Sequence, residues 1–305
     1  MSFVRNLAHL LRVRQYYKNV LIFIAIFFSE RLFDFSLYIP LLLGFVILCC
    51  ASSINYIIND IIDIKNDRNH PEKLKKKPLA SGELSLIFAI VLLIFLAGFI
   101  IISLVFLIPN FGFTLMIIFI IITGQLYNLV FKRYAFIDVI VLSLGYLWRA
   151  LAGCFIIEEY ISAWLFLAIF EIAMFLSIAK RKGDLILLGE NNAKEHKNVY
   201  DKYNLKLIDQ FYVITAASLF ITYSLYLILK FNLFDPSSVS WWEYAAIFTI
   251  PIALYIIMRY MYLTSNKPDI ARSTERAFLD KGIIIAGLIL FSILLFSFYF
   301  GNIFT

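Results

Sequence analysis

Three aspartates and an asparagine lie within the nine residues Asn59–Asp67, at the end of an apolar run. Asp60, Asp63 and Asp67 are spaced i, i+3 and i+7. On a helix that turns about 100° per residue, these four side chains fall within an arc of about 100°. Mg²⁺ in proteins is commonly held by one or two carboxylates and completes its shell with water and substrate phosphates. The pattern therefore predicts a Mg²⁺–diphosphate site with the three aspartates as catalytic metal ligands and Asn59 assisting. The plain structural alternative is a solvated polar helix end.

Basic residues surround this acidic cluster in the sequence. Lysines crowd the segment 73–77 directly after it, and further cations occur before the first apolar run, near residue 132 and at 180–182. Such residues can simply fix topology or attract anionic lipid. Beside a Mg²⁺–polyphosphate site they would also neutralise the remaining charge of the substrate.

The composition indicates that the acidic and basic residues described above belong to a membrane protein. Of the 305 residues, 62% are hydrophobic and 16% are charged, and the mean hydropathy is +0.86. Soluble domains are nearer 45–50% apolar. The sequence therefore predicts an all-α polytopic membrane protein, with one integral-membrane domain over residues 1–305. Windows long enough to cross the bilayer predict nine helices at 16–33, 37–60, 84–108, 111–131, 135–157, 161–180, 207–231, 240–263 and 282–303.

The distribution of cations predicts the orientation. Of the 27 Lys and Arg residues, all but three lie in segments on the same side as the N-terminus; Arg31 and Lys230 lie opposite, and Arg149 lies within a span. By the positive-inside rule this predicts the N-terminus inside and the C-terminus outside. The polar loops at about 61–83 and 180–206 then face the cytoplasm, which favours an enzyme of the inner membrane over a transporter. The net charge of +6 reflects this bias, so no nucleic-acid partner is expected.

Two ionisable residues lie deeper in the predicted spans. Arg149 and Glu171 fall on consecutive antiparallel helices at similar distances from the turn between them. Because an unpaired charge in hydrocarbon is costly, we expect them to form a structural intramembrane pair.

The motifs resemble those of the UbiA-type prenyltransferase superfamily, and most closely its decaprenyl-phosphate phosphoribosyltransferase branch. Asn59-Asp60-x-x-Asp63-x-x-x-Asp67 matches the first aspartate motif of the superfamily. The resemblance to the branch rests on Arg12-x-x-Gln15-x-x-Lys18-Asn19, Pro78-Leu79-Ala80-Ser81-Gly82, Tyr127-x-x-x-x-Lys132, Arg149-Ala150-x-Ala152-Gly153 and Lys180-Arg181-x-x-Asp184. It covers roughly residues 10–215. Val13 and Tyr16 depart from the pattern, which has Pro and Trp there.

The resemblance implies a UbiA-like helical bundle with a cytoplasmic-side active site that uses Mg²⁺. It implies transfer of a 5-phosphoribosyl group from phosphoribosyl diphosphate to a polyprenyl phosphate, for polysaccharide or cell-wall synthesis. The loop after the sixth span offers a single aspartate where ordinary prenyltransferases carry a second acidic motif, which suits a donor with an extra phosphate. The residues implied to bind donor phosphates are Lys18, Lys73, Lys77, Tyr127, Lys132, Lys180 and Arg181. Further implied site residues are Gln15, Asn19, Asp138 and Asp184.

Two other functions stay open at this point. A UbiA-type enzyme could instead move a polyprenyl group from its diphosphate to an aromatic or small acceptor. A transporter for an anionic solute fits less well, because the polar residues gather at one end of the helices. The bilayer, the lipid phosphate and the donor are the expected partners. The sequence sets neither the lipid length nor whether the chain forms a homo-oligomer.

Overall fold

The computed structural model describes residues 3–68, 74, 77–160, 162–189, 198–235, 237, 239–272 and 274–304. All regular structure in these ranges is helical, as the sequence predicts. The chain forms two compact units, and each is described separately. Unit 1 comprises Met1–Val130 and Gly145–Ile161, and unit 2 comprises Phe131–Leu144 and Ser162–Thr305.

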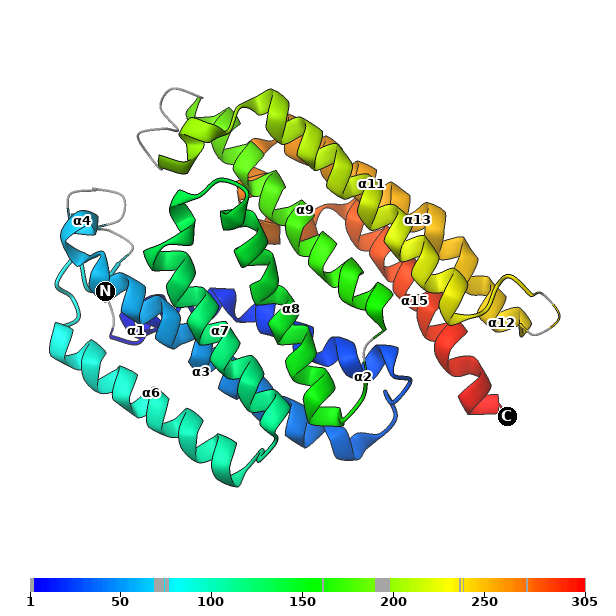
Figure 1. The fold of residues 1–305 in the computed structure, drawn as a ribbon, viewed down its shortest axis with the longest axis horizontal. Helices are drawn as coiled ribbons and strands as arrows, with labels where there is room; N and C mark the ends of the chain where they lie inside the picture. Colours follow the sequence, from blue (N-terminus) through cyan, green and yellow to red (C-terminus); the bar gives the residue numbers. More distant parts are fainter. Residues whose placement is uncertain are drawn as a thin grey trace. The chain divides into compact units, whose positions relative to one another are not determined.

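Unit 1 is built from long apolar helices preceded by an irregular N-terminal segment. Figure 1 labels its helices along the first half of the chain. The elements are α1 (Phe3–Leu11), η1 (Val13–Phe23), α2 (Ile24–Phe28), η2 (Phe35–Leu37), α3 (Tyr38–Ile62), α4 (Ile64–Arg68), α6 (Leu86–Phe106), α7 (Phe111–Leu129) and most of α8 (Ile137–Ile157).

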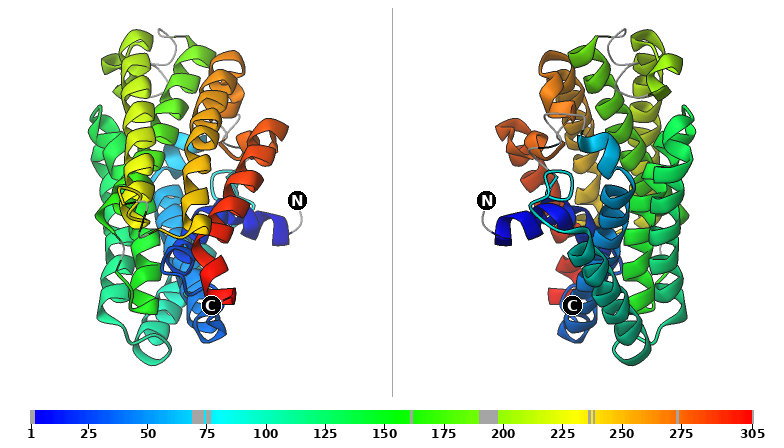
Figure 2. Two further views of the ribbon diagram at one scale, coloured as in Figure 1. Left: turned by 90° about the vertical axis from the view of Figure 1, so that its right-hand side faces the viewer. Right: turned by 90° about the vertical axis from the view of Figure 1, so that its left-hand side faces the viewer.

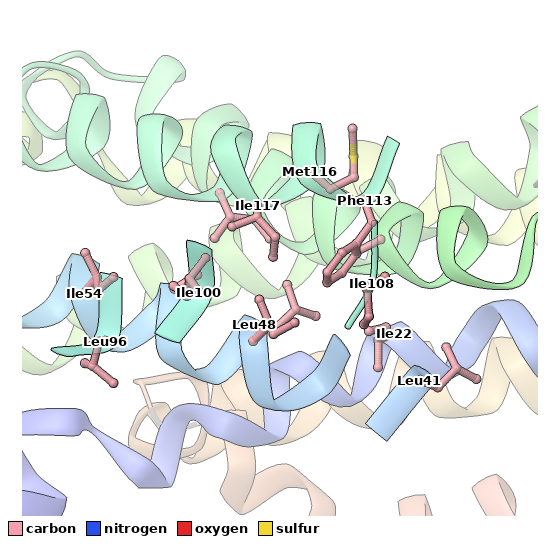
Figure 3. Packing of buried hydrophobic residues seen from close by; sticks show 14 of the residues in the cluster. Ile22, Leu41, Leu48, Ile54, Leu96, Ile100, Ile108, Phe113, Met116 and Ile117 are labelled. Carbon is pink, nitrogen blue, oxygen red and sulfur yellow. The ribbon is translucent and has the colours of Figure 1, made fainter. Parts of the chain in front are cut away.

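The core of unit 1 forms where α3, α6 and α7 pack together. Figure 3 shows buried side chains from these helices meeting in one layer, with Ile22 of η1 beside them. The labelled members are Ile22, Leu41, Leu48, Ile54, Leu96, Ile100, Ile108, Phe113, Met116 and Ile117. On the other side of α6, Ile87, Ile94 and Phe95 are exposed. A helix that is apolar all round in this way is typical of a membrane span.

Unit 2 contains a second set of long helices, which Figure 2 shows running alongside one another. Its elements are η3 (Phe131–Arg133), the start of α8, α9 (Ala163–Leu188), η4 (Asn198–Lys202), α11 (Leu205–Lys230), α12 (Trp241–Tyr244), η5 (Ala245–Phe248), α13 (Thr249–Asn266), α14 (Pro268–Arg272), η6 (Thr274–Leu279) and α15 (Lys281–Phe304). Aromatic contacts join three of them: the Phe175 ring of α9 stacks on Tyr212 of α11 at 4.7 Å and lies tilted against Tyr260 of α13 at 5.3 Å, centroid to centroid.

The long helices begin at side-chain caps that their sequences supply. Ser85, Asn110, Ser162 and Asn204 each accept a hydrogen bond from the backbone N–H three residues on, at the first turns of α6, α7, α9 and α11. These caps satisfy donors that the first helical turn leaves unpaired. They explain why the predicted spans begin close to where the helices do.

Eight helices among the described residues are long and apolar enough to cross a membrane. They correspond to the second to ninth predicted spans, which confirms a multi-pass helical protein. The first predicted span, 16–33, is instead the 3₁₀ segment η1 followed by the short α2, so a count of nine is not confirmed. Arg12 has a left-handed backbone (φ 52°), which breaks the chain away from α1 before η1 begins.

Candidate functional site

The acidic cluster lies where α3 ends, and two cations hold its carboxylates. Lys77 Nζ lies 3.1 Å from Asp60 Oδ1 and 2.6 Å from Asp67 Oδ2. Arg12 Nη2 donates to the same Asp60 oxygen at 2.9 Å. Both aspartates are buried, with Asp60 only 3% exposed. Carboxylates buried to this degree require such partners.

The backbone around Asp63 brings these aspartates together. Helix α3 ends at Ile62 and α4 begins at Ile64, with Asp63 between them. The hydrogen bonds from Asp63 N to Asn59 O (3.0 Å) and from Asp67 N to Asp63 O (2.8 Å) nevertheless keep the i to i−4 pattern. The chain thus continues close to helical, which explains how Asp60 and Asp67 reach one lysine.

A tight turn after Pro78 positions Lys77. The backbone N–H groups of Ala80 and Ser81 both donate to Lys77 O at 3.1 Å, and Leu84 N donates to Pro78 O. Leu79, Ala80 and Leu84 are buried and anchor the turn. Gly82 has φ +79°, a conformation that glycine adopts without strain. The segment Pro78–Gly82 therefore fixes the lysine that precedes it.

The arrangement suits a divalent cation held with substrate phosphates. Asp60 and Asp67 already place carboxylate oxygens around one positive charge, the Lys77 ammonium, which stands where a metal ion could bind. Among the described residues, no group of three acidic, histidine or cysteine side chains could hold a metal without other ligands. Mg²⁺ does not need such a group, because it keeps waters and binds substrate phosphates. Asn59 and Asp63 are half-buried beside the pair, and their predicted roles as ligands stay predictions.

The N-terminal segment lies against α3 through a series of polar contacts. Arg12 stacks over the Tyr56 ring at 4.5 Å, and Tyr16 O–H and Ser53 Oγ share a hydrogen bond of 2.8 Å. Lys18 Nζ lies 5.8 Å from the Tyr146 ring centroid. Gln15 is half-buried in η1. The polar groups of η1 thus contact both α3 and α8.

Arg149 belongs to unit 1 and Glu171 to unit 2, and each has hydrogen-bond partners within its own unit. Arg149 Nε donates to Asn19 Oδ1 at 2.7 Å, Nη2 donates to Ser52 Oγ at 3.2 Å, and Nη1 donates to Gly145 O. Glu171 Oε1 accepts from Ser218 Oγ. The pairing of Arg149 and Glu171 with each other stays a prediction.

In unit 2, the predicted site residues Asp138, Arg181 and Asp184 form a buried network with two tyrosines. Arg181 donates from Nε to Asp138 Oδ2 at 2.9 Å, and Tyr203 O–H donates to Asp138 Oδ1 at 2.8 Å. Tyr200 O–H donates to Asp184 Oδ2 at 2.6 Å. Burial raises the pKa of the Tyr200 and Tyr203 hydroxyls above the ordinary value, so both stay protonated donors.

Arg181 is the centre of this network. The residue is 2% exposed, and its guanidinium also donates to Tyr200 Oη at 3.4 Å. A guanidinium used in this way ties the start of α8, helix α9 and η4 together. Arg181 thus stabilises the fold of unit 2, and its role in binding donor phosphates stays a prediction.

The remaining predicted phosphate-binding residues occupy varied positions. Tyr127 is half-buried at the end of α7, Lys132 is half-buried in η3, and Lys180 is exposed on α9. Lys73 lies outside the described residues. The roles of these four residues stay predictions.

The structure adds residues that were not predicted as site members. Arg12 holds Asp60. Ser52 and Ser53 donate to Asn19 and Leu11 of the N-terminal segment, and Tyr200 and Tyr203 complete the network of unit 2. One signal was available for Arg12, since Arg12, Gln15 and Lys18 are spaced at three residues. The serines gave none, because small polar residues are common in membrane helices.

The chain belongs to the UbiA prenyltransferase family, which it matches over residues 20–282. It is therefore a transferase enzyme and a multi-pass membrane protein of that family. The fold agrees: the structure of a UbiA homolog from Archaeoglobus fulgidus bound to GPP and Mg²⁺ superposes with a TM-score of 0.65 at 18% identity, covering 95% of this chain and 97% of that one. The same homolog bound to Cd²⁺ gives a TM-score of 0.63 at 17% identity, covering 95% and 97%.

Among curated proteins, the chain is similar to enzymes named decaprenyl-phosphate phosphoribosyltransferase. The protein of Mycolicibacterium smegmatis is 26% identical over 266 residues, which are 84% of this chain and 82% of the relative. The protein of Corynebacterium glutamicum is 28% identical over 251 residues, which are 80% and 74% of the two chains. The matches extend over most of the chain and are not confined to the aspartate motif.

Proposed function

We propose that this chain transfers a 5-phosphoribosyl group from phosphoribosyl diphosphate to a polyprenyl phosphate and releases diphosphate. The observation that carries the proposal is the similarity to decaprenyl-phosphate phosphoribosyltransferases over 80% or more of this chain. The arrangement of Asp60 and Asp67 around one cation supports it, because a diphosphate leaving group needs charge neutralisation. The proposed location is the cytoplasmic face of the inner membrane.

The proposed site is the acidic cluster of unit 1. Asp60 and Asp67 hold Mg²⁺, with Asp63 and Asn59 as additional ligands, and Arg12 keeps the Asp60 carboxylate oriented. When bound, Mg²⁺ supplies Lewis-acid stabilisation of charge on the departing diphosphate. Lys77, released from the carboxylates, donates to diphosphate oxygens. Lys77 thus neutralises the aspartates in the absence of the metal, and neutralises the diphosphate once the metal and the substrate are bound.

The bond changes require little of the protein beyond position and charge. An oxygen of the lipid phosphate attacks the anomeric carbon of the ribose as the bond from that carbon to diphosphate breaks. The phosphate oxygen is already anionic near neutral pH, so no strong general base is needed. Holding the two substrates in line supplies much of the rate.

The test uses membranes that contain the full chain, ribose-labelled phosphoribosyl diphosphate, polyprenyl phosphate and Mg²⁺. We expect a labelled lipid that is lost on adding EDTA and restored by excess Mg²⁺. Asp60→Asn should lower the rate about 100-fold or more. Asp34→Asn, which removes a carboxylate bound to Arg31 in the turn before η2, serves as the matched control and should retain activity.

Either of two results would contradict the proposed reaction and indicate a different function. Transfer of a prenyl group from its diphosphate to 4-hydroxybenzoate, with no labelled lipid, would establish the prenyltransferase alternative. Uptake of a solute into proteoliposomes without any covalent product would indicate a transporter.

A further inference from the structure

Arg149 brings a positive charge into a membrane-spanning helix, and its hydrogen-bond partners in the described structure are all neutral. They are the side-chain oxygens of Asn19 and Ser52 and the backbone carbonyl of Gly145. An intramembrane charge is costly unless an opposite charge or water compensates it. These neutral acceptors satisfy the guanidinium geometry and carry no charge that offsets its own. An anionic ligand would complete the arrangement.

The neutral partners are themselves held in place. Asn19 is 1% exposed, accepts from Ser52 Oγ at 3.3 Å and donates to Cys49 Sγ at 3.2 Å. The Asn19 carbonyl is thereby aimed at Arg149 Nε. A guanidinium has five N–H donors, and three are used here, which leaves one on Nη1 and one on Nη2. These two donors are available to a ligand that accepts two parallel hydrogen bonds, as a phosphate does.

A second cation lies on the same side of α8. Tyr146 precedes Arg149 by three residues, so the two share a helix face, and Lys18 Nζ lies 5.8 Å from the Tyr146 ring centroid. Lys18 directly precedes Asn19, the residue that accepts a hydrogen bond from Arg149. Two cations that face one region match the charge of a phosphomonoester.

This region is separate from the acidic cluster. Ser52 and Asp60 are both on α3, eight residues apart, which corresponds to about 12 Å along the helix. One diphosphate held at Asp60 and Lys77 does not also place the same phosphate at Arg149. The proposed reaction involves two further phosphate groups: the 5-phosphate of the donor and the phosphate of the lipid acceptor.

We propose that Arg149 and Lys18 bind a phosphomonoester, with Asn19 and Ser52 as positioning residues. The ligand is either the 5-phosphate of the sugar donor or the phosphate of the lipid acceptor, and this part of the inference rests on the proposed function. In either case Arg149 binds a phosphate group that is not part of a prenyl diphosphate donor.

The experiment measures binding to the purified full chain in lipid nanodiscs with paired probes. Ribose 5-phosphate is compared with ribose, and geranyl phosphate with geraniol; binding of diphosphate with Mg²⁺ is measured in the same samples. Arg149→Gln should weaken binding of a phosphorylated probe about 10- to 100-fold and leave its dephosphorylated partner and the diphosphate unchanged. Loss for ribose 5-phosphate assigns the donor, loss for geranyl phosphate assigns the acceptor, and loss for both supports a shared phosphomonoester site.

Asn19→Asp is the second variant, because it is nearly isosteric and places a carboxylate 2.7 Å from Arg149 Nε. Its internal counter-charge should cause the same loss of phosphate binding in a folded protein. Arg31→Gln is the control: it also removes an arginine of unit 1, which bonds to Asp34, and should leave binding unchanged.

The proposal is overturned if the wild type shows no phosphate-dependent binding, or if neither Arg149→Gln nor Asn19→Asp changes it. Arg149-dependent binding without formation of labelled lipid would refute the proposed reaction and leave the phosphate site standing. If labelled lipid forms but phosphate binding is unchanged in both Arg149→Gln and Asn19→Asp, the phosphate site is refuted and the proposed reaction stands.

Discussion

Lys77 stands between two buried carboxylates at the point where the proposed metal would bind. Its ammonium is 2.6 Å from Asp67 and 3.1 Å from Asp60, so it and a metal ion compete for the same oxygens. The lysine has two roles in the proposed reaction. It compensates the aspartates before the metal and donor bind, and it binds diphosphate afterwards.

Lys77→Met should therefore strengthen metal binding in the absence of donor. Removing the competing ammonium should raise the affinity for Mn²⁺, measured by electron paramagnetic resonance of the free ion, by about three- to tenfold. The Michaelis constant for phosphoribosyl diphosphate should increase in the same variant, since a phosphate ligand is lost.

Lys65→Met provides the matched control, because Lys65 is an exposed lysine on α4 close to the same aspartates in sequence. It should change neither quantity. Unchanged or weaker Mn²⁺ binding in Lys77→Met would show that the lysine does not compete with the metal.

The positions of the aspartates could be predicted from the sequence, whereas their partners Lys77 and Arg12 could not. The spacing of Asp60 and Asp67 places them on one helix face, and that geometry is local. Lys77 is one of four lysines between residues 73 and 77, and the choice among them depends on the turn after Pro78 and on the positive φ of Gly82. Arg12 is 48 residues from Asp60, and their contact depends on how η1 packs on α3.

At the scale of elements, η1 packs against α8 at a glycine. A Cβ on Gly153 would lie 2.0 Å from Ile22 O, a backbone atom that cannot move aside alone. The close approach keeps η1 beside α3 and α8, and so holds Arg12, Lys18 and Asn19 in position. This explains the need for glycine in the segment Arg149–Gly153.

Gly153→Ala should destabilise the protein by about 2–3 kcal/mol through this overlap. The measurement is the thermal unfolding midpoint in detergent. Gly98→Ala is the control on α6, where a Cβ meets nothing within 4 Å, and it should leave the midpoint unchanged or slightly higher. Equal midpoints for the two variants would contradict the close packing of η1 on α8.

The short η4 is held to unit 2 by the buried tyrosines. Tyr200→Phe should lower the free energy of unfolding by about 1–3 kcal/mol, because it removes the buried hydrogen bond that Tyr200 donates to Asp184. The reference is Tyr134→Phe, a half-exposed tyrosine whose hydroxyl should contribute little. Equal stability of Tyr200→Phe and wild type at pH 8 would show that the network does not stabilise η4.

Tyr200 should also make the free energy of unfolding decrease as the pH becomes alkaline. Since burial raises the pKa of the Tyr200 hydroxyl, the folded state favours the protonated form. Its contribution is complete below the ordinary value of 10.0 and is lost as pH rises from there toward the folded-state pKa. Denaturant unfolding from pH 8 to pH 11 should show a steeper loss of stability in wild type than in Tyr200→Phe. Parallel curves would contradict this linkage.

For the whole molecule, hydropathy predicts the helical membrane fold because each span is a long local signal. Eight of the nine predicted spans correspond to such helices. The window at 16–33 is not a long α-helix for a physical reason: Lys18 and Asn19 interrupt its apolar residues and contact Tyr146 and Arg149 of α8. Contacts of that kind join distant residues and leave no periodic trace in the sequence.

The proposed orientation makes a prediction about accessibility. After Cys49, Cys50 and Cys154 are replaced by alanine, a single cysteine is introduced as Lys65→Cys or Tyr160→Cys; Tyr160 is 99% exposed. A membrane-impermeant maleimide should label Tyr160→Cys in intact spheroplasts, and should label Lys65→Cys only after lysis. The reverse pattern would place the acidic cluster on the outer face.

The mass spectrum of the product lipid tests the proposed reaction most directly. Purified protein is incubated with a polyprenyl phosphate of defined length, uniformly ¹³C-labelled phosphoribosyl diphosphate and Mg²⁺. The proposed function predicts a lipid heavier by one labelled phosphoribosyl group, released diphosphate in equal amount, and neither product in Asp60→Asn. An unchanged polyprenyl phosphate, in a preparation that binds Mg²⁺ and diphosphate, would contradict it.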